Sequence, residues 1–543
     1  MYVGAYYNRD DDIVHVAERI NGKRVLKTFK PQHRFYFPSK NGEYTSIFGQ
    51  RLEKFETSTR AKFYKEKESY EGQRLYESDT NILFRTLYDN YHDKGAPNLN
   101  QAMFDIEVDF DPSIGFSTPE NPYAPINAIS VYMNWLDTMF TLALPPKTLH
   151  WNDALVITEK FDNTFLFATE RELLDTFLQI VEDVDVFTGW NSTGFDIPYT
   201  VLRIQKVLGD EYTKKLCLWD MEPVRREYER FNKKVFTYDL IGKVHLDYLD
   251  LYKKNTYQEL HSYKLDFVGE TEVQENKIPY TGSLYDLYHN DFEKFLAYNR
   301  QDTMLLVKID RKKKFIELHN QLAHSISVDF NATMGSVAII DQAIINEAHE
   351  RGLIVFDKRG FRQEGKAAGA YVRDPITGLH KWVGACDINS LYPSVIRSLN
   401  MSPETLIGQI RQTFTRKLID DRIAAGMTAT DAWHEMFGSL EYQEVMKRSD
   451  VMLTIDYDLN GVPQARSEEK TAKEIYDMVF CDGSNMCLSA NGTLFRTDIE
   501  GVIPGLLGKW YHTRTEYKNK AKKFLTQAKG VEVDDELMEL LAA

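Results

Sequence analysis

Four carboxylates, in three short motifs, constrain the fold of this chain more than any other feature of its sequence. In MFDIEV, Asp105 and Glu107 lie two residues apart in an apolar run, so on a β-strand both side chains point to the same face. In GWNSTGFDIPY, Asp196 follows a turn and precedes a predicted helix. In FLAYNRQDTM, Tyr298 and Asp302 are four residues apart and share one face of a helix. A strand, a turn and a helix in this order favour one α/β domain.

Each motif alone also fits an ordinary structural role: a common strand pattern, a helix cap or a surface pair. Together the four carboxylates would repel one another strongly unless a cation lay between them. Such a set can hold two Mg²⁺ ions about 3.5–4 Å apart, which clamp the attacking and leaving oxygens of a phosphodiester. We therefore predict a site for two Mg²⁺ or Mn²⁺ ions, beside which Tyr298 would orient the attacking water.

A further aspartate, Asp387, stands in CDINSLYPSVIRS after the apolar run WVGAC, which predicts a strand. Backbone amides around Ser390 and Leu391 could hold a triphosphate beside it. An ion that handles phosphates usually needs more than one carboxylate. The nearest Asp-x-Asp is formed by Asp456 and Asp458 in LTIDYDLNGV, but the Asn-Gly that follows marks an ordinary hairpin.

The net charge of −15 argues by itself against a nucleic-acid partner, because such binding depends on Lys and Arg neutralising phosphates. Residues 509–529 depart from this average, with seven Lys and Arg against one acid. They predict a long basic helix on which Arg514, Lys518 and Lys522 form a stripe at successive four-residue steps. A solvated helix face is the alternative, and it is the favoured interpretation of the second basic cluster, residues 308–314.

The remaining composition excludes several classes of protein. A hydrophobic content of 43% supports sizeable cores, and the length allows about three to four domains. The first residues have neither the basic nor the apolar region of a signal peptide, and no apolar run is long enough to span a membrane. The four cysteines are scattered without zinc-site spacing. We expect a cytoplasmic chain, in the host cytoplasm if it is viral, with reduced thiols and no membrane partner.

Taken in order, FDIE, N-x3-FD and Y-x3-D resemble the three exonuclease motifs of the DnaQ-like proofreading domain of family B DNA polymerases. The resemblance implies a 3′–5′ exonuclease that acts on single-stranded DNA ends with two Mg²⁺ or Mn²⁺ ions. It implies that four carboxylates hold the metal, that a tyrosine lies beside the water and that an asparagine lies near the single-stranded end. In that order these residues are Asp105, Glu107, Asp196, Asp302, Tyr298 and Asn191.

CDINSLYPSVIR resembles motif A of the same polymerases, and SLNMSPET, FDIPY and LDYLDLYKK are similar to their T-even bacteriophage branch. The resemblance implies a second two-metal site and, beside it, a nucleotide site in which a tyrosine lies under the sugar and rejects a ribose by shape. It also implies that an Arg and a Lys, four apart on the basic helix, grip the nucleotide's phosphates. The residues matched to the metal are Asp387 and Ile388, and those matched to the nucleotide are Ser390, Leu391, Tyr392, Arg514 and Lys518.

The implied fold is multidomain, with α/β and α+β parts. It contains a DnaQ-like (RNase H-like) exonuclease domain, a β-rich N-terminal domain whose first segment alternates like strands, and partial palm and fingers. The expected boundaries are 1–99 and 315–358 for the two segments of the N-terminal domain, 100–314 for the exonuclease domain, 359–490 for half of the palm with an unassigned insertion at about 413–474, and 491–543 for half of the fingers. Residues 222–240 resemble the family's strand-separating hairpin.

After motif A the family pattern continues with Lys-x3-Asn-Ser-x-Tyr-Gly and Asp-Thr-Asp, and neither occurs here. We therefore expect the N-terminal part of a polymerase that is either split into two polypeptides or truncated. Its partners would be primer–template DNA, dNTPs and a second chain carrying the rest of palm, fingers and thumb; a sliding clamp is a further candidate. A free-standing exonuclease with an inactive palm remnant is one alternative, against which the retained nucleotide residues speak. A non-enzymatic nucleic-acid-binding regulatory subunit is another, against which the complete carboxylate set speaks.

Overall fold

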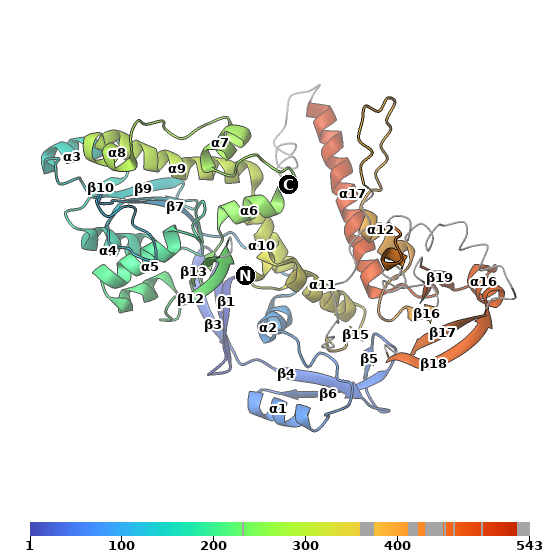
Figure 1. The fold of residues 1–543 in the computed structure, drawn as a ribbon. Helices are drawn as coiled ribbons and strands as arrows, with labels where there is room; N and C mark the ends of the chain where they lie inside the picture. The colour runs from blue at the N-terminus through green and yellow to red at the C-terminus, as the bar shows by residue number, and fades with distance from the viewer. Residues whose placement is uncertain are drawn as a thin grey trace.

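The computed structural model describes residues 1–230, 233–358, 374–410, 422–428, 449, 452–459, 462–489 and 492–528. Figure 1 shows three groups of elements: an α/β body, the N-terminal sheets, and a further sheet beside the long helix α17 (Val502–Ala528). Helices α10 (Phe315–Ile326) and α11 (Ser336–Glu350) run between the α/β body and the last group. None of the described helices is both long and apolar enough to cross a membrane.

The first N-terminal sheet is antiparallel. Strands β1 (Tyr2–Asn8), β2 (Ile13–Ile20) and β3 (Lys23–Phe29) pair in this order. The predicted Asn-Gly hairpin is formed between β2 and β3. Asn21 and Gly22 adopt φ angles of 51° and 77°, the left-handed conformation that a tight two-residue turn requires.

The second N-terminal sheet joins segments far apart in the sequence, in the order β15-β5-β6-β4. Its strands are β4 (His33–Pro38), β5 (Tyr44–Ser46), β6 (Arg51–Thr57) and β15 (Leu353–Ile354). Two helices, α1 (Arg60–Glu68) and α2 (Ile82–Tyr91), also lie in the first 99 residues, where the sequence pattern favoured strands. The side chain of Asn81 begins α2 by accepting hydrogen bonds from the amides of Leu83 and Phe84.

A six-stranded sheet forms the centre of the α/β body, in the order β10-β9-β8-β7-β11-β14. Its strands are β7 (Gln101–Val108), β8 (Ile126–Met133), β9 (Thr138–Ala143), β10 (Thr164–Leu166), β11 (Val186–Thr188) and β14 (Val244–His245). The helices of this body are α3 (Trp151–Thr158), α4 (Glu170–Ile180), α5 (Asp196–Val207), the 3-10 helix η1 (Asp210–Leu216), α6 (Tyr248–Asn255), α7 (Leu265–Val273), α8 (Leu284–Asn290) and α9 (Phe292–Lys313). In Figure 1, α4 and α5 cover one side of the sheet, and α8 and α9 cover the other.

Strand β7 presents alternate residues to the two helix layers, as its sequence predicts. Phe104 and Ile106 pack in a core with side chains of α4 and α5. Asp105 faces α9, where the side-chain amide of Asn299 donates to its carboxylate. The strand thus covers its apolar side chains and turns its carboxylates toward α9.

The third group contains a five-stranded sheet in the order β18-β17-β16-β20-β19. Its strands are β16 (Leu406–Ile410), β17 (Met452–Leu459), β18 (Val462–Thr471), β19 (Met486–Leu488) and β20 (Thr493–Arg496), and the helix α16 (Ala472–Phe480) follows β18. The segment 413–474, for which the sequence offered no motif, supplies β17 and β18 and is in part integral to this sheet. Its remaining residues lie largely outside the described ranges, and Asn460 and Gly461 are among them.

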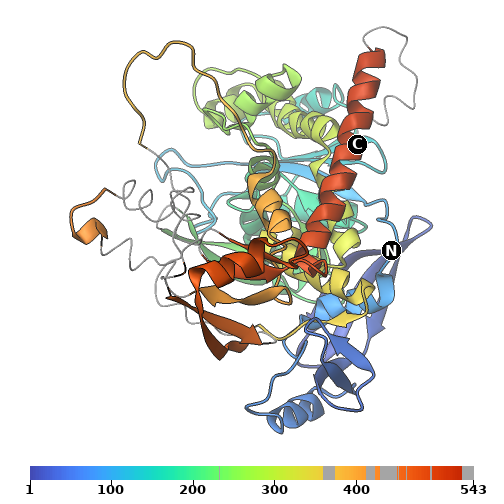
Figure 2. The same cartoon turned by 90° about the vertical axis from the view of Figure 1, so that its right-hand side faces the viewer.

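The basic helix predicted over 509–529 forms within α17, and both views place α12 (Leu391–Ser398) beside it (Figures 1 and 2).

The strand expected at 382–386 is not formed. Trp382 and Val383 are 100% and 76% exposed, and no described strand pairs with them. A strand needs neighbours to stabilise it, so a local pattern alone does not suffice. Residues 369–373 of the GAYVRDP motif and the last residues, 529–543, lie outside the described ranges.

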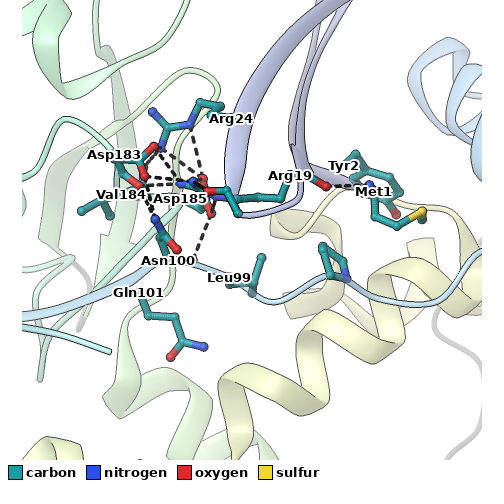
Figure 3. A network of polar contacts seen from close by, with 12 residues as sticks. Met1, Tyr2, Arg19, Arg24, Leu99, Asn100, Gln101, Asp183, Val184 and Asp185 are labelled. Atoms are coloured by element: carbon teal, nitrogen blue, oxygen red, sulfur yellow. Dashed lines mark hydrogen bonds and ion pairs between the residues drawn. The ribbon is translucent and has the colours of Figure 1, made fainter. Parts of the chain in front are cut away.

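A buried ionic network fastens the first hairpin to the central sheet (Figure 3). Arg19 of β2 donates from Nε to Asp185 Oδ2 at 2.7 Å, and Arg24 of β3 lies 3.1 Å from the other oxygen of Asp185. Asp183 pairs with Arg19, and the amide of Asn100 donates to Asp185 at 3.0 Å. Because Asn100 and Asp185 immediately precede β7 and β11, the network fixes the ends of the two central strands.

Candidate metal and nucleic-acid site

Three of the predicted carboxylates meet at one point between β7 and α9. One carboxylate oxygen each from Asp105, Glu107 and Asp302 lies within 4.8 Å of the others. Among the residues described, no other group of three His, Cys, Asp or Glu side chains comes as close together. Asp196, the first residue of α5, reaches the same strand, because its Oδ1 accepts a hydrogen bond from the amide of Ile106 at 3.2 Å.

Burial raises the pKa of all four carboxyl groups, and repulsion by other members of the cluster adds to this for Asp105 and Glu107. Burial raises the pKa of Asp105 well above its ordinary value, and the neighbouring Glu107 adds to this. Burial, reinforced by the charge of Asp302, raises the pKa of Glu107 to about 8. Burial raises the pKa of Asp196 to about 7 and also raises that of Asp302. Without a cation this cluster therefore retains protons near neutral pH, and a bound cation would favour its ionised form.

The donor set fits a hard divalent cation. All four side chains offer carboxylate oxygens, the ligands that Mg²⁺ and Mn²⁺ prefer. Asp302 is 3% exposed, and its Oδ1 is buried without a hydrogen-bond partner. A buried acceptor without a partner is costly, and coordination to an ion would satisfy it.

Lys277 is a member of this site that sequence reasoning missed. Its ammonium group pairs with Asp302 and lies 3.1 Å from the hydroxyl of Tyr298. Burial alone would lower the pKa of Lys277, but the negative charges of Asp302 and Asp105 outweigh it and raise the pKa. Lys277 lies in a loop without periodicity, so no sequence pattern connects it to the carboxylates.

Tyr298 is placed on α9 one turn before Asp302. The side chain is 9% exposed, and the ring of Tyr280 packs against it edge-on at 5.3 Å between centroids. Burial and the charge of Asp302 raise the pKa of Tyr298, so its hydroxyl keeps its proton at neutral pH. It can therefore donate a hydrogen bond to a water or a substrate oxygen at the cluster.

Asn191 lies in the turn between β11 and α5. Its φ angle is 63°, a left-handed conformation that Asn tolerates better than most residues. The same turn leads directly into Asp196. Asn191, the residue predicted to contact single-stranded DNA, therefore lies five positions before Asp196 of the carboxylate cluster.

The residues around the predicted metal ligand Asp387 are exposed. Ser390 has a φ angle of 53° and begins α12, and the side chain of Tyr392 is 68% exposed. Asp387 itself is exposed, as are the neighbouring side chains of Ile388 and Leu391, and Asp387 belongs to no group of three possible ligands among the described residues.

Helix α12 and the turn before it contact α17. The side-chain amide of Asn389 lies 3.4 Å from the hydroxyl of Tyr511, and the guanidinium of Arg397 lies 4.8 Å from the centroid of the Tyr511 ring. Arg514 and Lys518 are exposed and lie three and seven residues beyond Tyr511, so they share its helix face. The predicted phosphate-binding pair therefore continues the face of α17 that α12 contacts.

The alternative acidic pair, Asp456 and Asp458, is part of the hairpin β17–β18. The hydroxyl of Ser467 donates to Asp456 Oδ1 at 2.7 Å across the hairpin.

In the second basic cluster, the side chains of Lys308, Arg311, Lys312 and Lys313 form ion pairs with acids of the same α/β body. This favours the interpretation of 308–314 as a paired, structural surface.

Comparison with known proteins identifies relatives for most of the chain. Residues 53–268 match the model of the family described as DNA polymerase family B, exonuclease domain, and residues 326–538 match that of DNA polymerase family B. The DNA-directed DNA polymerase of Escherichia phage RB69 is 29% identical over 333 residues, which cover 58% of this chain and 36% of that protein. The DNA-directed DNA polymerase of Enterobacteria phage T4 is 30% identical over 262 residues, covering 47% of this chain and 28% of that protein. The DNA polymerase of Thermococcus sp. (strain 9oN-7) is 27% identical over 349 residues, covering 61% and 41%. The matched stretches thus span less than half the length of these relatives.

Proposed function

Because the chain belongs to DNA polymerase family B, we propose that its α/β body is a two-metal 3′–5′ exonuclease that removes nucleotides from single-stranded DNA ends. The observation that carries this proposal is the cluster of Asp105, Glu107 and Asp302, with its buried Asp302 oxygen that has no hydrogen-bond partner. Asp196 completes the set of ligands. Two bound Mg²⁺ or Mn²⁺ ions would supply charge stabilisation to the attacking and leaving oxygens of the phosphodiester.

The chain's own residues position the substrate and the water. Asn191 holds the single-stranded end next to the cluster. The Tyr298 hydroxyl donates a hydrogen bond that orients the water, and its position is set by packing against Tyr280. The ammonium of Lys277 balances part of the negative charge of the carboxylates.

The experiment is digestion of a 5′-labelled single-stranded oligonucleotide with Mg²⁺. We expect stepwise shortening from the 3′ end that EDTA stops, and its loss in Asp105→Ala and in Asp302→Ala. Asp153→Ala, which removes an exposed carboxylate on α3, is the matched control and keeps the wild-type rate. Wild-type digestion by either cluster variant would refute the assignment.

We also propose that the residues around Asp387 form part of a nucleotidyl-transfer site. Asp387, with the backbone at Ile388, contributes to a metal site, while Ser390, Leu391 and Tyr392 contact a dNTP whose phosphates Arg514 and Lys518 bind. A single carboxylate holds Mg²⁺ weakly, so the site acts only with carboxylates from outside the described residues. We infer that the part of the family's polymerases with the Lys-x3-Asn-Ser-x-Tyr-Gly and Asp-Thr-Asp motifs supplies them, either on the same polypeptide or on a second one.

Exposed apolar side chains before and after Asp387 in the sequence support a docking partner at this site. They are Ile376, Leu379, Trp382, Val383, Ile388, Leu391, Tyr392 and Val395, and each is at least 43% exposed. Contiguous apolar surface of more than a few hundred Å² on a protein usually marks an interaction site. These side chains precede and follow Asp387 in the sequence, and the proposed completing part of the palm would cover them.

Primer extension tests this second proposal. The chain alone should not extend a primed template with dNTPs, and a mixture with the polypeptide that carries the missing motifs should. Asp387→Ala should abolish extension, and Arg514→Ala should raise the KM for dNTP. Lys520→Ala is the matched control for Arg514→Ala, because it removes the same charge from another face of α17.

Extension by the chain alone, or extension that survives Asp387→Ala, would contradict the proposal. A mixture that digests DNA but never extends it would favour a free-standing exonuclease.

A further inference from the structure

The turn that carries Asn191 and leads into Asp196 is tightly fitted against the sheet. A Cβ atom on Gly189, at the start of this turn, would lie 2.8 Å from the backbone oxygen of Phe104. Only glycine therefore allows the turn to approach β7 this closely. Within the turn, the backbone amide of Gly194 donates to the backbone oxygen of Asn191 at 3.0 Å, and that of Ile197 donates to the backbone oxygen of Ser192 at 3.0 Å. Side chains from outside the turn grip its backbone as well.

Asp247 provides such a grip from the other side of the turn. It is the N-cap of α6, where its Oδ1 accepts a hydrogen bond from the amide of Leu249 at 2.9 Å. The same carboxylate accepts two further hydrogen bonds from backbone amides. Its Oδ1 accepts one from Asn191 at 3.0 Å, and its Oδ2 accepts one from Thr193 at 2.9 Å. Asp247 is 6% exposed, and no Lys, Arg or His within the described ranges forms an ion pair with it. Three backbone amides are thus the partners of this buried carboxylate.

Residues around Asp247 reinforce the same contact. His245 hydrogen-bonds the hydroxyl of Ser192 at 2.8 Å, and the indole of Trp190 donates to the backbone oxygen of Tyr263 at 3.1 Å. The turn is therefore held at Trp190, Asn191, Ser192 and Thr193 by one segment, which runs from the end of β14 past α6.

The position of this turn determines where two residues of the cleavage site lie. Asn191 is within the turn, and Asp196 follows it as the first residue of α5, where Asp196 accepts the amide of Ile106 between Asp105 and Glu107. We propose that Asp247 is a positioning residue of the exonuclease: its carboxylate clamps the turn and so fixes Asn191 for the DNA strand and Asp196 for the metal. This inference rests on the proposed exonuclease function.

Asp247→Asn separates this role from the cap of α6. Asn is as good an N-cap as Asp, so the variant keeps the helix start. One of its two acceptor oxygens becomes an NH2 group, which cannot accept the hydrogen bond from the backbone amide of Thr193, because both groups are donors. If the side chain flips, the hydrogen bonds from the backbone amides of Asn191 and Leu249 are lost instead. Asp250→Asn is the matched control, because it removes the same charge from an exposed site one turn along α6.

Three measurements on the full chain test the proposal. In Asp247→Asn, the amides of Asn191 and Thr193 should exchange with deuterium faster than in the wild type and in Asp250→Asn. Binding of a single-stranded oligonucleotide in EDTA should weaken by about tenfold, the size expected for a lost charge-assisted hydrogen bond. The Mg²⁺ concentration for half-maximal cleavage should rise, and excess Mg²⁺ should restore the maximal rate.

The outcomes distinguish this inference from the proposed function. If the wild type does not cleave DNA, the proposed function fails, whatever Asp247 does. If the wild type cleaves DNA and Asp247→Asn has the same amide exchange, DNA affinity and Mg²⁺ dependence, the positioning role is refuted. A loss of maximal rate that excess Mg²⁺ does not restore, with unchanged affinity, would also refute it, because this is the behaviour of a partly unfolded variant.

Discussion

At the scale of single residues, the charge of Lys277 controls how readily the carboxylate cluster ionises. Its ammonium lowers the pKa of Glu107 and of Asp302, against the effect of burial, which raises both. Metal binding needs the ionised carboxylates, so protons compete with the ions below the raised pKa values.

Lys277→Met should therefore raise these pKa values further. We expect the acid limb of the pH–rate profile for single-strand cleavage to move to higher pH by about one unit, the usual effect of one close opposite charge. Lys277→Arg, which keeps the charge, is the control and should leave the limb near its original pH. The measurement is kcat/KM between pH 5 and pH 9 at constant Mg²⁺. An unchanged acid limb in Lys277→Met would show that the lysine does not act on the cluster.

The sequence could predict that carboxylates of β7 and α9 share faces with their neighbours, because spacing on a strand or helix determines the face that a side chain occupies. Asp105 and Glu107 share a strand face, and Tyr298 and Asp302 share a helix face. Lys277 and Asn299 could not be found in this way. They contact Asp302 and Asp105 across 25 and 194 residues of sequence, so only the folded chain shows these contacts.

At the scale of elements, the hairpin of β12 (Val224–Arg230) and β13 (Lys233–Asp239) forms a two-stranded sheet of its own. Its base is anchored, because Tyr238 is 7% exposed and packs in the core beside α5. Arg225, the ladder partner of Tyr238, and the adjacent Arg226 are exposed. The resemblance noted above assigns strand separation to this hairpin.

Replacement of residues 226–235 by a short Gly-Ser linker should test that role and preserve Tyr238. We expect an unchanged rate on single-stranded DNA and a slower rate on paired 3′ ends, because the variant cannot hold the strands apart. A labelled oligonucleotide, alone and annealed, provides the comparison. Equal loss on both substrates would mean that the hairpin supports the fold and not strand separation.

Elements with a strong local signal could be predicted, and those that depend on distant partners could not. The Asn21–Gly22 hairpin, the strand β7 and the helices α9 and α17 each carry their own periodicity or turn chemistry. The apolar run at 382–386 has the composition of a strand but no described neighbour. The pairing of β15 with β5 joins segments about three hundred residues apart, which local periodicity cannot predict. Only the family resemblance assigned residues 1–99 and 315–358 to one domain.

At the scale of the whole molecule, the network around Asp185 ties the N-terminal hairpin to the six-stranded sheet of the α/β body (Figure 3). The side chains of Arg19 and Asp185 are 4% and 0% exposed, so the pair is shielded from solvent. Removal of one partner leaves the other charge buried, which is costly.

Arg19→Ala should therefore destabilise the protein by about 3 kcal/mol, the lower end of the range for broken buried pairs, because Arg24 still contacts Asp185. Lys160→Ala, which breaks a pair with Glu293 in which both side chains are half-exposed, should cost less than about 1 kcal/mol. Denaturant unfolding measures both. A loss in Arg19→Ala no larger than that in Lys160→Ala would mean that the network does not fasten the two parts.

The central claim is that four carboxylates of the α/β body hold two catalytic metal ions. Anomalous diffraction from a crystal of the chain with Mn²⁺ and a short single-stranded oligonucleotide tests it most directly. We predict two anomalous peaks, about 3.5–4 Å apart, among Asp105, Glu107, Asp196 and Asp302. In Asp302→Ala the peaks should weaken or disappear. A well-ordered cluster without Mn²⁺ at saturating concentration, or Mn²⁺ bound only elsewhere on the chain, would contradict the account.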